Sequence, residues 1–254
     1  MRHFLLAGAA IVAMVSVAFV AENKQVTIRW HGQSFFEVIT SDGTRIAFDP
    51  HAIEEYGPTN VETDLLLVTH PHEDHNQVGV IPNRMKAKLL QAVTGMGNKQ
   101  KWVEVDEKFK NVRVRSLSRT GTFHDQYDGE KRGKNGIWVV DFDGLTLVHM
   151  GDVGHELSAA QIKAIGKVDI LMIPVGGIYT VNGSEAKLIV EQLKPRLYVF
   201  PMHYGTKVYD FLATPEEFLE GNENVRKKLD TNEISFNSDL KLATPETVIL
   251  GWTK

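Results

Sequence analysis

Three histidines and one aspartate stand within six consecutive positions of this chain, from His70 to His75, in the order His-x-His-x-Asp-His. Imidazole is a common ligand of zinc, iron and related divalent metals, and a carboxylate adds an oxygen ligand and negative charge. An extended loop can aim His70, His72 and Asp74 at one point, whereas a helix would turn alternate side chains about 200° apart. With 10 histidines in 254 residues, a polar loop without a metal is the weaker interpretation of this cluster.

The cluster directly follows residues 64–68, a short apolar segment typical of a buried strand. Loops at strand ends often carry function. Three further residues of ligand type, His124, Asp152 and His203, follow apolar segments in the same way. Each alone is more typical of a turn or a cap, but the seven together suffice for two metals with a position open for water.

The elements that must position these residues alternate along the chain. The apolar patterns predict strands at residues 26–30, 35–39, 44–48, 64–68, 88–93, 112–117, 136–142, 145–150, 170–174 and 197–201. Helices are predicted at 158–165 and 184–193, and another begins at 215–219. Asp143-Gly144 is a tight-turn signal between two of the strands. Strand-rich and βα segments thus share one domain, residues 22–254, which favours two sheets flanked by helices.

The N-terminus has the pattern of a secretory signal peptide, residues 1–21. A short basic start precedes residues 4–20, which are apolar or small and carry no charge. Ser16-Val17-Ala18 is the best cleavage triplet, and Ala21 is a second candidate. We therefore expect an exported, periplasmic protein. Secretion is an alternative, and so is an uncleaved N-terminal anchor, since about 17 apolar residues lie at the lower limit for spanning a membrane.

The composition excludes some chemistry. The chain has no cysteine, so that thiolate ligands, cysteine nucleophiles and disulfides are absent. Its formal net charge is −4, and no block of lysine and arginine stands out, which argues against nucleic acid as a partner. A small-molecule substrate is expected instead.

Several short motifs surround the predicted ligands, and together they resemble a known family. They are Trp30-His31-Gly32-Gln33-Ser34-Phe35, Phe48-Asp49-Pro50, the histidine cluster, His124-Asp125 with Arg132-Gly133-Lys134-Asn135, His149-Met150-Gly151-Asp152, Pro174-Val175-Gly176-Gly177 and Pro201-Met202-His203-Tyr204. From about residue 26 to 250 the chain resembles the metallo-β-lactamase superfamily, and more closely its ascorbate-phosphate-lactonase-like branch of metal-dependent hydrolases. The resemblance implies an α/β fold, a four-layer αββα sandwich of two mixed sheets flanked by helices, with metals at one edge between the sheets.

The resemblance also implies a ligand set and an activity. His70, His72 and His124 would bind one divalent metal, Asp74, His75 and His203 a second, and Asp152 would bridge both. The expected function is an exported dinuclear metal-dependent hydrolase that uses a metal-bridging hydroxide to cleave a small ester, lactone or phosphoester. Asp74 and Asp152 would act in catalysis by holding and orienting that hydroxide. Zinc is the expected metal, with manganese or iron as alternatives.

The roles of four residues near these motifs stay open. Gln33 stands where the family often has a histidine, and His31 where an apolar residue is usual. Either difference is expected to change the pocket or a contact to the ligands. Tyr179 and Tyr204 are expected at the rim of the pocket, either as amphipathic wall residues or as hydrogen-bond donors to the substrate.

Other residues of similar type have simpler interpretations. Asp49 either accepts an N–H bond from a ligand histidine or is a turn residue before a proline. His51 and His155 are interpreted as loop residues, and His149 as a packed, hydrogen-bonded histidine on a strand. Gly176-Gly177 lacks the spacing and the lysine of a P-loop, so a close approach of the backbone near the metals explains it better.

Three alternative functions share the same metal core. They are a phosphodiesterase or nuclease, a β-lactamase, and a metal-binding sensor or scaffold without catalysis. The lack of cysteine excludes the β-lactamase classes with a cysteine ligand. The substrate depends on the loops around residues 51–63, 76–86, 125–135 and 204–214, whose shapes the sequence does not determine.

Overall fold

The computed structural model describes residues 24–124 and 132–252. The predicted signal peptide, residues 1–21, lies outside these described residues, and so does Asp125. Within the described ranges, none of the helices has both the length and the apolar character needed to cross a membrane.

The first of two large sheets has six strands in the order β17-β1-β2-β3-β4-β5. Their bounds are β1 (Gln25–Trp30), β2 (Phe36–Ile39), β3 (Arg45–Phe48), β4 (Leu65–Val68), β5 (Lys88–Gln91) and β17 (Glu233–Asn237). The strands from β17 to β3 pair antiparallel, and β3, β4 and β5 pair parallel. The sheet is therefore mixed, as predicted.

The second sheet has eight strands in the order β16-β18-β15-β14-β13-β12-β9-β8. Their bounds are β8 (Asp106–Phe109), β9 (Val112–Ser116), β12 (Trp138–Phe142), β13 (Leu145–His149), β14 (Ile170–Pro174), β15 (Tyr198–Met202), β16 (Val225–Lys228) and β18 (Glu246–Leu250). Strands β8 to β13 are antiparallel, and β13, β14, β15, β18 and β16 run parallel. Two further sheets have two short strands each, β6 (Val93–Thr94) with β7 (Lys101–Trp102) and β10 (Thr122–Phe123) with β11 (Lys134–Asn135).

The predicted hairpin between β12 and β13 is confirmed. Phe142 pairs with Leu145 across the turn. The two turn residues have positive φ, 50° at Asp143 and 76° at Gly144, the conformation that a two-residue hairpin loop with Asp-Gly favours.

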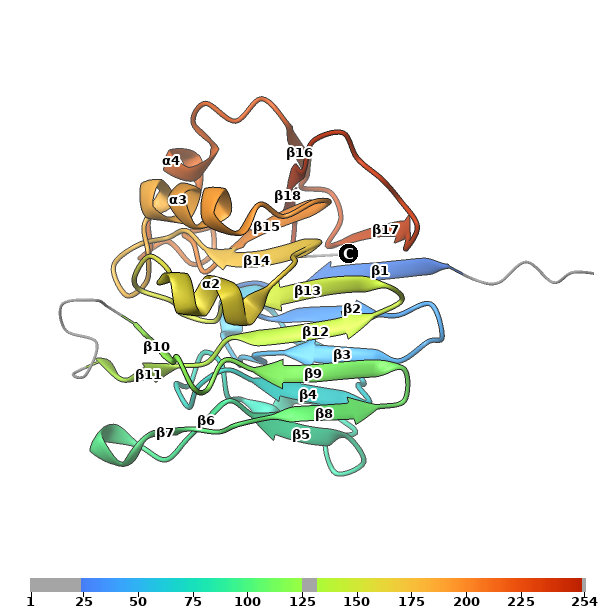
Figure 1. Ribbon diagram of the computed structural model, residues 1–254, viewed down its shortest axis with the longest axis vertical. Helices are drawn as coiled ribbons and strands as arrows, with labels where there is room; N and C mark the ends of the chain where they lie inside the picture. The colour runs from blue at the N-terminus through green and yellow to red at the C-terminus, as the bar shows by residue number, and fades with distance from the viewer. Residues whose placement is uncertain (1–23, 125–131, 253–254) are drawn as a thin grey trace, which may run out of the picture.

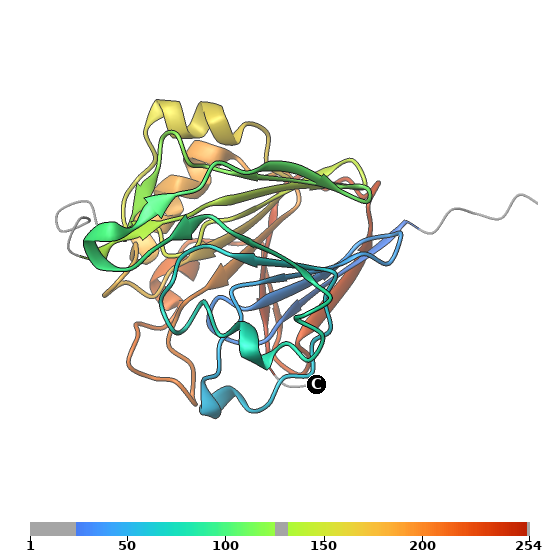
Figure 2. The same cartoon turned by 90° about the horizontal axis from the view of Figure 1, so that it is seen from below.

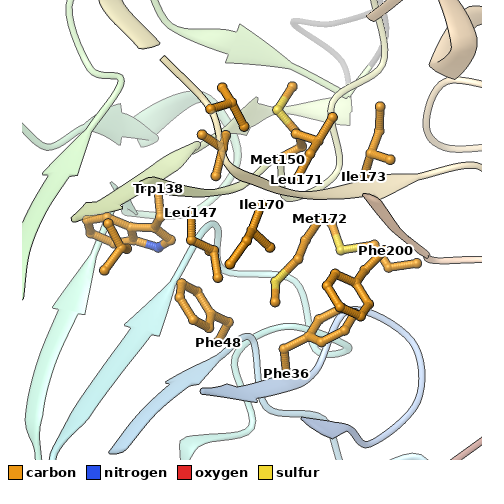
Figure 3. Close-up of a cluster of buried hydrophobic side chains, with 14 of the residues drawn as sticks. Phe36, Phe48, Trp138, Leu147, Met150, Ile170, Leu171, Met172, Ile173 and Phe200 are labelled. Carbon is orange, nitrogen blue, oxygen red and sulfur yellow. The ribbon is translucent and has the colours of Figure 1, made fainter. Parts of the chain in front are cut away.

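The hydrophobic core lies between the two large sheets (Figure 3). Phe36 and Phe48 of the first sheet point toward Leu147, Ile170 and Met172 of the second, and all five are buried. Along β14, alternate side chains point to opposite faces, as a pleated strand requires. A strand buried on both faces reads as a continuous apolar run, which is why the sequence predicted β14 with the bounds that the structure has.

Three α-helices pack on the outer face of the eight-stranded sheet (Figure 2). They are α2 (Ala159–Ile165), α3 (Gly183–Leu193) and α4 (Glu216–Leu219). Ser158 caps α2 as predicted, in a capping box with Gln161. Helix α3 begins one residue earlier than predicted because Asn182 caps it in the same way, with Glu185.

The outer face of the six-stranded sheet carries a second, smaller core. Leu66 and Ala47 pack there with Phe35, Val61 and Ile81. Among the described residues, short 3₁₀ turns and loops cover this face, and no α-helix does. The 3₁₀ turns of the described residues are η1 (Glu54–Tyr56), η2 (Val78–Val80) and η3 (Gly97–Lys99). The connection from β4 to β5 begins with the histidine loop. Only residues 78–87 are then left to cover the outer face of the six-stranded sheet. The predicted architecture of two mixed sheets is thus confirmed, with few helices.

The strand directions bring the predicted site together at one edge. Parallel strands end at the same side of a sheet, which is where open α/β sheets usually bind ligands. Asp49 follows β3 and His70 follows β4 in the first sheet, whereas Asp152 follows β13 and His203 follows β15 in the second. The two sheets therefore contribute to one site from both sides of the core (Figure 1).

Candidate metal centre

The structure brings all seven predicted ligand residues into two adjacent groups. Ligand atoms of one group lie within 4.8 Å of one another, and so do those of the other. The first group is His70, His72 and His124, and the second is Asp74, His75, Asp152 and His203. Asp152 lies between them: its Oδ2 is 3.8 Å from both His70 Nε2 and His124 Nδ1 and 3.2 Å from His203 Nε2. The residues that the resemblance names as ligands thus lie together, and their assignment to individual metals stays a prediction.

Two buried imidazole nitrogens of the first group, His70 Nε2 and His124 Nε2, have no hydrogen-bond partner. In the second group His75 Nε2 and Asp152 Oδ1 lie 3.1 Å apart. An unpaired polar atom in a protein interior is costly, and native structures contain few. A set of imidazoles and carboxylates without thiolates suits zinc, manganese or iron. The residues present therefore fit two divalent metal ions.

The electrostatics differ between the two groups. Burial lowers the pKa of His124 to about 4 and that of His70 far below its ordinary value, so both imidazoles are neutral and ready to bind a cation. In the second group, burial acts to lower the pKa of His203, but the carboxylates of Asp152 and Asp74 outweigh it and raise the pKa to about 9. Metal binding at the second group must therefore displace a proton from an imidazole.

The two carboxylates are ionised. Burial acts to raise the pKa of Asp152, yet the imidazoles of His203 and His75 outweigh this effect and hold the pKa well below its usual range. The same balance lowers the pKa of Asp74, whose Oδ2 is 3.4 Å from His75 Nε2. Both side chains are thus in the form that binds a metal or accepts a proton.

The buried carboxylate of Asp49 holds residues of the histidine loop in place by hydrogen bonds. Its carboxylate accepts hydrogen bonds from the backbone N–H of Thr69 at 2.7 Å, from the Thr69 hydroxyl at 2.6 Å and from His75 Nδ1 at 2.7 Å. Of the two interpretations left open by the sequence, the contact to a ligand histidine is therefore confirmed. Because Asp49 holds Nδ1 of His75, the ring turns its Nε2 toward Asp152, 3.1 Å away.

The same hydrogen bonds fix the tautomer of His70. The hydroxyl of Thr69 donates its one hydrogen to Asp49, so toward His70 Nδ1, 2.9 Å away, it can only accept. His70 must then carry its proton on Nδ1, which leaves a lone pair on the buried Nε2. Asp49 and Thr69 thus prepare two histidines of the cluster as metal ligands.

Gln33 contacts residues of the second ligand group. Its side-chain Nε2 donates to Asp74 Oδ2 at 3.1 Å, and its carbonyl accepts from the backbone N–H of His203 at 3.2 Å. Both Gln33 and His203 have a φ of 50°, and Asp49 has a φ of 45°. Positive φ is uncommon for residues other than glycine, and its cost in free energy must be offset by the surrounding structure. Residues in this conformation are frequent at functional sites. Gln33 thus contacts a predicted ligand directly; what the difference from a histidine changes at this position stays a prediction.

The predicted close approach of the backbone at Gly176 is confirmed. A Cβ atom at this position would lie 2.2 Å from the carbonyl oxygen of His203, which no side chain tolerates. The glycine lets the end of β14 pass directly beside the end of β15. It is therefore required for packing, as the lack of a P-loop pattern indicated.

Two other histidines have structural roles, as predicted. His149 stacks on Phe48 with ring centroids 5.1 Å apart, and its Nε2–H donates to the carbonyl of Ser34 at 3.0 Å. His155 lies in a loop, where its Nε2 accepts from the backbone N–H of Phe123 at 3.2 Å. Neither belongs to the ligand groups.

A pocket of about 960 Å³ opens onto the two groups. Its lining includes His72, Asp74, His124, Asp152 and His203 together with Ala52, Ile53, Glu73, Gln77, Arg132, Tyr179, Tyr209 and Phe211. Tyr179 thus lines the pocket as expected, whereas Tyr204 is buried and stacks on Trp30 at 5.3 Å. Arg132, Tyr209 and Phe211 belong to the loops on which the substrate was expected to depend, around residues 125–135 and 204–214, but none of them was given an individual role from the sequence. The only signal for the last two was their place in a loop that follows a predicted ligand.

Comparisons with known proteins agree with this geometry. Residues 27–203 match the family model described as the β-lactamase superfamily domain. A UPF0173 metal-dependent hydrolase of Thermococcus onnurineus is 32% identical over 213 residues, which cover 76% of this chain and 90% of the relative. A second one, of Pyrococcus furiosus, is 35% identical over 173 residues, 61% of this chain and 72% of the relative.

A solved structure has the same fold over nearly its whole length. It is a proposed Zn-dependent hydrolase of the metallo-β-lactamase superfamily from Thermotoga maritima, with a TM-score of 0.67 and 27% identity. The alignment covers 89% of this chain and 98% of that one. The fold and the histidine and aspartate site define a metal-dependent hydrolase of the metallo-β-lactamase superfamily. Within it, the chain belongs to the UPF0173 metal-dependent hydrolase family.

The role of Asp49 can be tested by metal affinity. In Asp49→Asn, an amide offers one acceptor oxygen where the carboxylate offers two, so at least one of its three donors loses its partner. We expect the affinity for zinc, measured by competition with a chromogenic chelator, to fall about 10- to 100-fold. Asp143→Asn is a matched control, since Asp143 also has positive φ and also accepts from a backbone N–H and a hydroxyl, those of Ser41. Equal affinities of the two variants would contradict the role of Asp49.

His51 makes the stability of the fold depend on pH. Its ring is buried, with Nε2 3.1 Å from the carbonyl of His31, and burial lowers its pKa to about 4. Because the unfolded chain binds this proton near pH 6.5, the contribution of His51 is present above pH 6.5. It is lost as the pH falls toward 4, by about 3 kcal/mol. Urea unfolding of the wild type and of His51→Gln at pH 7, 5.5 and 4 should show the difference between them shrinking by that amount; a constant difference would refute the assignment.

Proposed function

We propose that the protein is a dinuclear hydrolase of small esters, lactones or phosphoesters. In this proposal His70, His72 and His124 hold one metal, Asp74, His75 and His203 hold the other, and Asp152 contacts both. The observation that carries it is the position of Asp152, whose Oδ2 lies within 3.8 Å of nitrogens from both groups beside a pocket. A single-metal site would need no carboxylate between two sets of histidines.

The chain's own residues divide the remaining work. When bound, two divalent ions lower the pKa of a water molecule and polarise the oxygen of the electrophile, so hydrolysis needs no strong protein base. The side chain of Asp152 is 3% exposed and that of Asp74 is 29% exposed. We therefore assign to Asp152 the orientation of the water and to Asp74, which meets the pocket, the transfer of its proton. Gln33 fixes one oxygen of Asp74 for this purpose.

The pocket favours a small molecule as the substrate. Its volume of about 960 Å³ lies in the range of small-molecule sites. Among the described residues of the lining, Arg132 is the one arginine or lysine and Glu73 adds a negative charge, so the lining offers no basic stripe for an extended polyanion such as nucleic acid. The resemblance to the lactonase-like branch places lactones and phosphoesters first among candidate substrates. The zinc dependence proposed for the Thermotoga relative supports zinc as the first metal to test.

Turnover is expected to depend on both metals and on Asp152. We expect the chain from residue 22, loaded with zinc or manganese, to hydrolyse one class within a paired panel of lactones and phosphodiesters. A chelator should abolish turnover and added metal should restore it. Asp152→Ala should lower kcat/KM about 1000-fold, because it removes the carboxylate shared by both groups.

The matched control is Asp230→Ala, which removes an exposed aspartate that does not line the pocket. Turnover that survives the chelator or Asp152→Ala would contradict the proposed function. If metal is bound but neither substrate class is cleaved, the interpretation as a metal-binding protein without catalysis gains support.

We propose further that residues 1–21 direct export to the periplasm. The uncharged apolar segment after a basic start supports this. When the full chain is produced in a bacterium, we expect a periplasmic product whose N-terminus is residue 19 or residue 22. Cell fractionation with N-terminal sequencing measures this outcome. An intact chain in the membrane fraction would indicate an anchor, and an intact chain in the cytosol would contradict export.

A further inference from the structure

One part of the pocket lining differs in character from the metal groups. Arg132, Tyr179, Tyr209 and Phe211 line the same pocket as the ligand residues, and three of these four are aromatic. Among the described residues that line this pocket, Arg132 is the one arginine or lysine. The remaining charged groups of the lining are acidic or belong to the proposed metal ligands. Among the described residues, Arg132 is thus the one cationic side chain that an anion meets in the pocket without contacting the metals.

The guanidinium of Arg132 is held in place before any ligand binds. Its Nη1–H donates to the carbonyl of Ile178 at 2.6 Å, and its Cζ lies 5.0 Å from the ring centroid of Tyr179. A guanidinium carries five N–H donors, so further donors remain for a carboxylate or a phosphate. Because the side chain is already ordered, binding an anion costs less conformational entropy.

The segment that holds Arg132 has a strained backbone. Ile178 has a φ of 62°, and the N–H of Tyr179 donates to the carbonyl of Gly177 at 2.7 Å, which makes a γ-turn of the rare form with positive φ. For a β-branched residue this φ is an outlier, and such strain persists where the surroundings enforce it, often at ligand sites. The next residues anchor the turn, since Val181 N–H donates to the carbonyl of Val153 at 2.9 Å. The turn presents a carbonyl to Arg132 and a ring to the pocket.

The aromatic side chains form one surface beside Arg132. Tyr179 is 45% exposed and Phe211 is 48% exposed, although both are large and aromatic. Their ring centroids lie 6.2 Å apart, and Phe211 contacts Tyr209 at 4.6 Å. Aromatic rings that gather on a pocket wall and stay exposed are typical of a surface that binds an apolar part of a ligand.

We propose that Arg132, Tyr179 and Phe211 form a recognition site for an amphipathic anion. The carboxylate or phosphate of the substrate binds the guanidinium of Arg132, and an adjoining apolar group packs on Tyr179 and Phe211. Glu73 is the one acidic residue of the described lining that is not a proposed metal ligand, and its charge disfavours the same anion on that part of the wall. This inference rests on the proposed hydrolase function and names the class of its substrate: a small ester that carries a negative charge away from the bond that breaks.

A binding experiment on the zinc-loaded protein tests this without turnover. The probes are 3-phenylpropionate, 2-phenylethyl phosphate and the neutral 3-phenylpropanamide, measured by isothermal titration calorimetry. We expect one or both anions to bind about 10- to 100-fold more tightly than the amide, the difference expected for hydrogen bonds to a charged group. Arg132→Gln should abolish this preference. Arg132→Lys should retain part of it, because lysine keeps the positive charge but lacks the planar guanidinium that donates two parallel hydrogen bonds.

Two further variants separate the parts of the site. Phe211→Ala should weaken all three probes by a similar factor, since it removes apolar contact but no charge. Lys134→Gln is the matched control: it removes a positive charge two residues from Arg132, on a side chain that packs over Trp102 at 4.6 Å and does not line the pocket. Equal binding of the amide and the anions, or a preference that survives Arg132→Gln, would overturn the proposal. The latter result would mean that the anions bind the metals directly.

A kinetic experiment tests whether the recognition site also contributes to hydrolysis. p-Nitrophenyl butyrate and mono-p-nitrophenyl glutarate share a leaving group and differ by a terminal carboxylate. Arg132→Gln should lower kcat/KM for the glutarate about 10- to 100-fold, mainly through KM, and leave the butyrate within about threefold. An equal effect on both esters would contradict the recognition site. Intact anion binding without turnover on any substrate would contradict the hydrolase function alone, so the two failures are distinguishable.

Discussion

The metal site depends on one buried carboxylate that is not itself a proposed ligand. Asp49 ends β3 and accepts three hydrogen bonds from groups at and beyond the end of β4, which ties the histidine loop to the sheet. Through Thr69 it also fixes the proton of His70, and it fixes that of His75 directly. A flexible loop with the same four ligand residues would have to order its backbone and choose its tautomers during metal binding. In this protein the folded structure already orders the backbone of the loop and fixes the tautomers. Less of the free energy of metal binding is therefore spent on ordering the ligands.

The second dependence is on the contact between the two sheets. Each sheet supplies only part of each ligand group, so the distance between the groups is set by the large side chains packed between the sheets (Figure 3). At the edge, the backbone N–H of His203, directly after β15, donates to the carbonyl of Gln33, in the turn between β1 and β2. Just beyond the end of β13, the amide of Asn135 on β11 accepts from the N–H of Asp152 at 2.9 Å and donates to the carbonyl of Met150 at 2.8 Å. Core packing therefore sets the coarse geometry of the site, and a few hydrogen bonds to backbone set its fine geometry.

This division explains how much the sequence could predict. A ligand cluster, a buried strand such as β14 and a hairpin turn at Asp143 are local patterns, and the structure has all three. Strands β16, β17 and β18 were not predicted, because their place depends on pairing with distant segments, such as β17 with β1 across more than half the chain. The contact from Gln33 to Asp74 could likewise not be predicted, since it requires both the positive φ of Gln33 and the relative position of two loops. Sequence patterns identify ligand types; they do not identify which side chain orients which ligand.

The proposed metal ligands and the proposed recognition site occupy different parts of this fold, and their physical constraints differ. The proposed ligands lie at strand ends or in the loops that follow them, where strand pairing and the core determine their positions. Arg132, Tyr179 and Phe211 lie on connecting segments, and their order comes from local contacts such as the strained turn at Ile178. Substitutions in those segments alter the pocket wall without moving the strand ends, so a fold and a metal site define the class of reaction but leave the substrate open. The substrate of this hydrolase must therefore be inferred from the charge and shape of the pocket wall, where, among the described residues, the guanidinium of Arg132 beside exposed aromatic rings is the most specific feature.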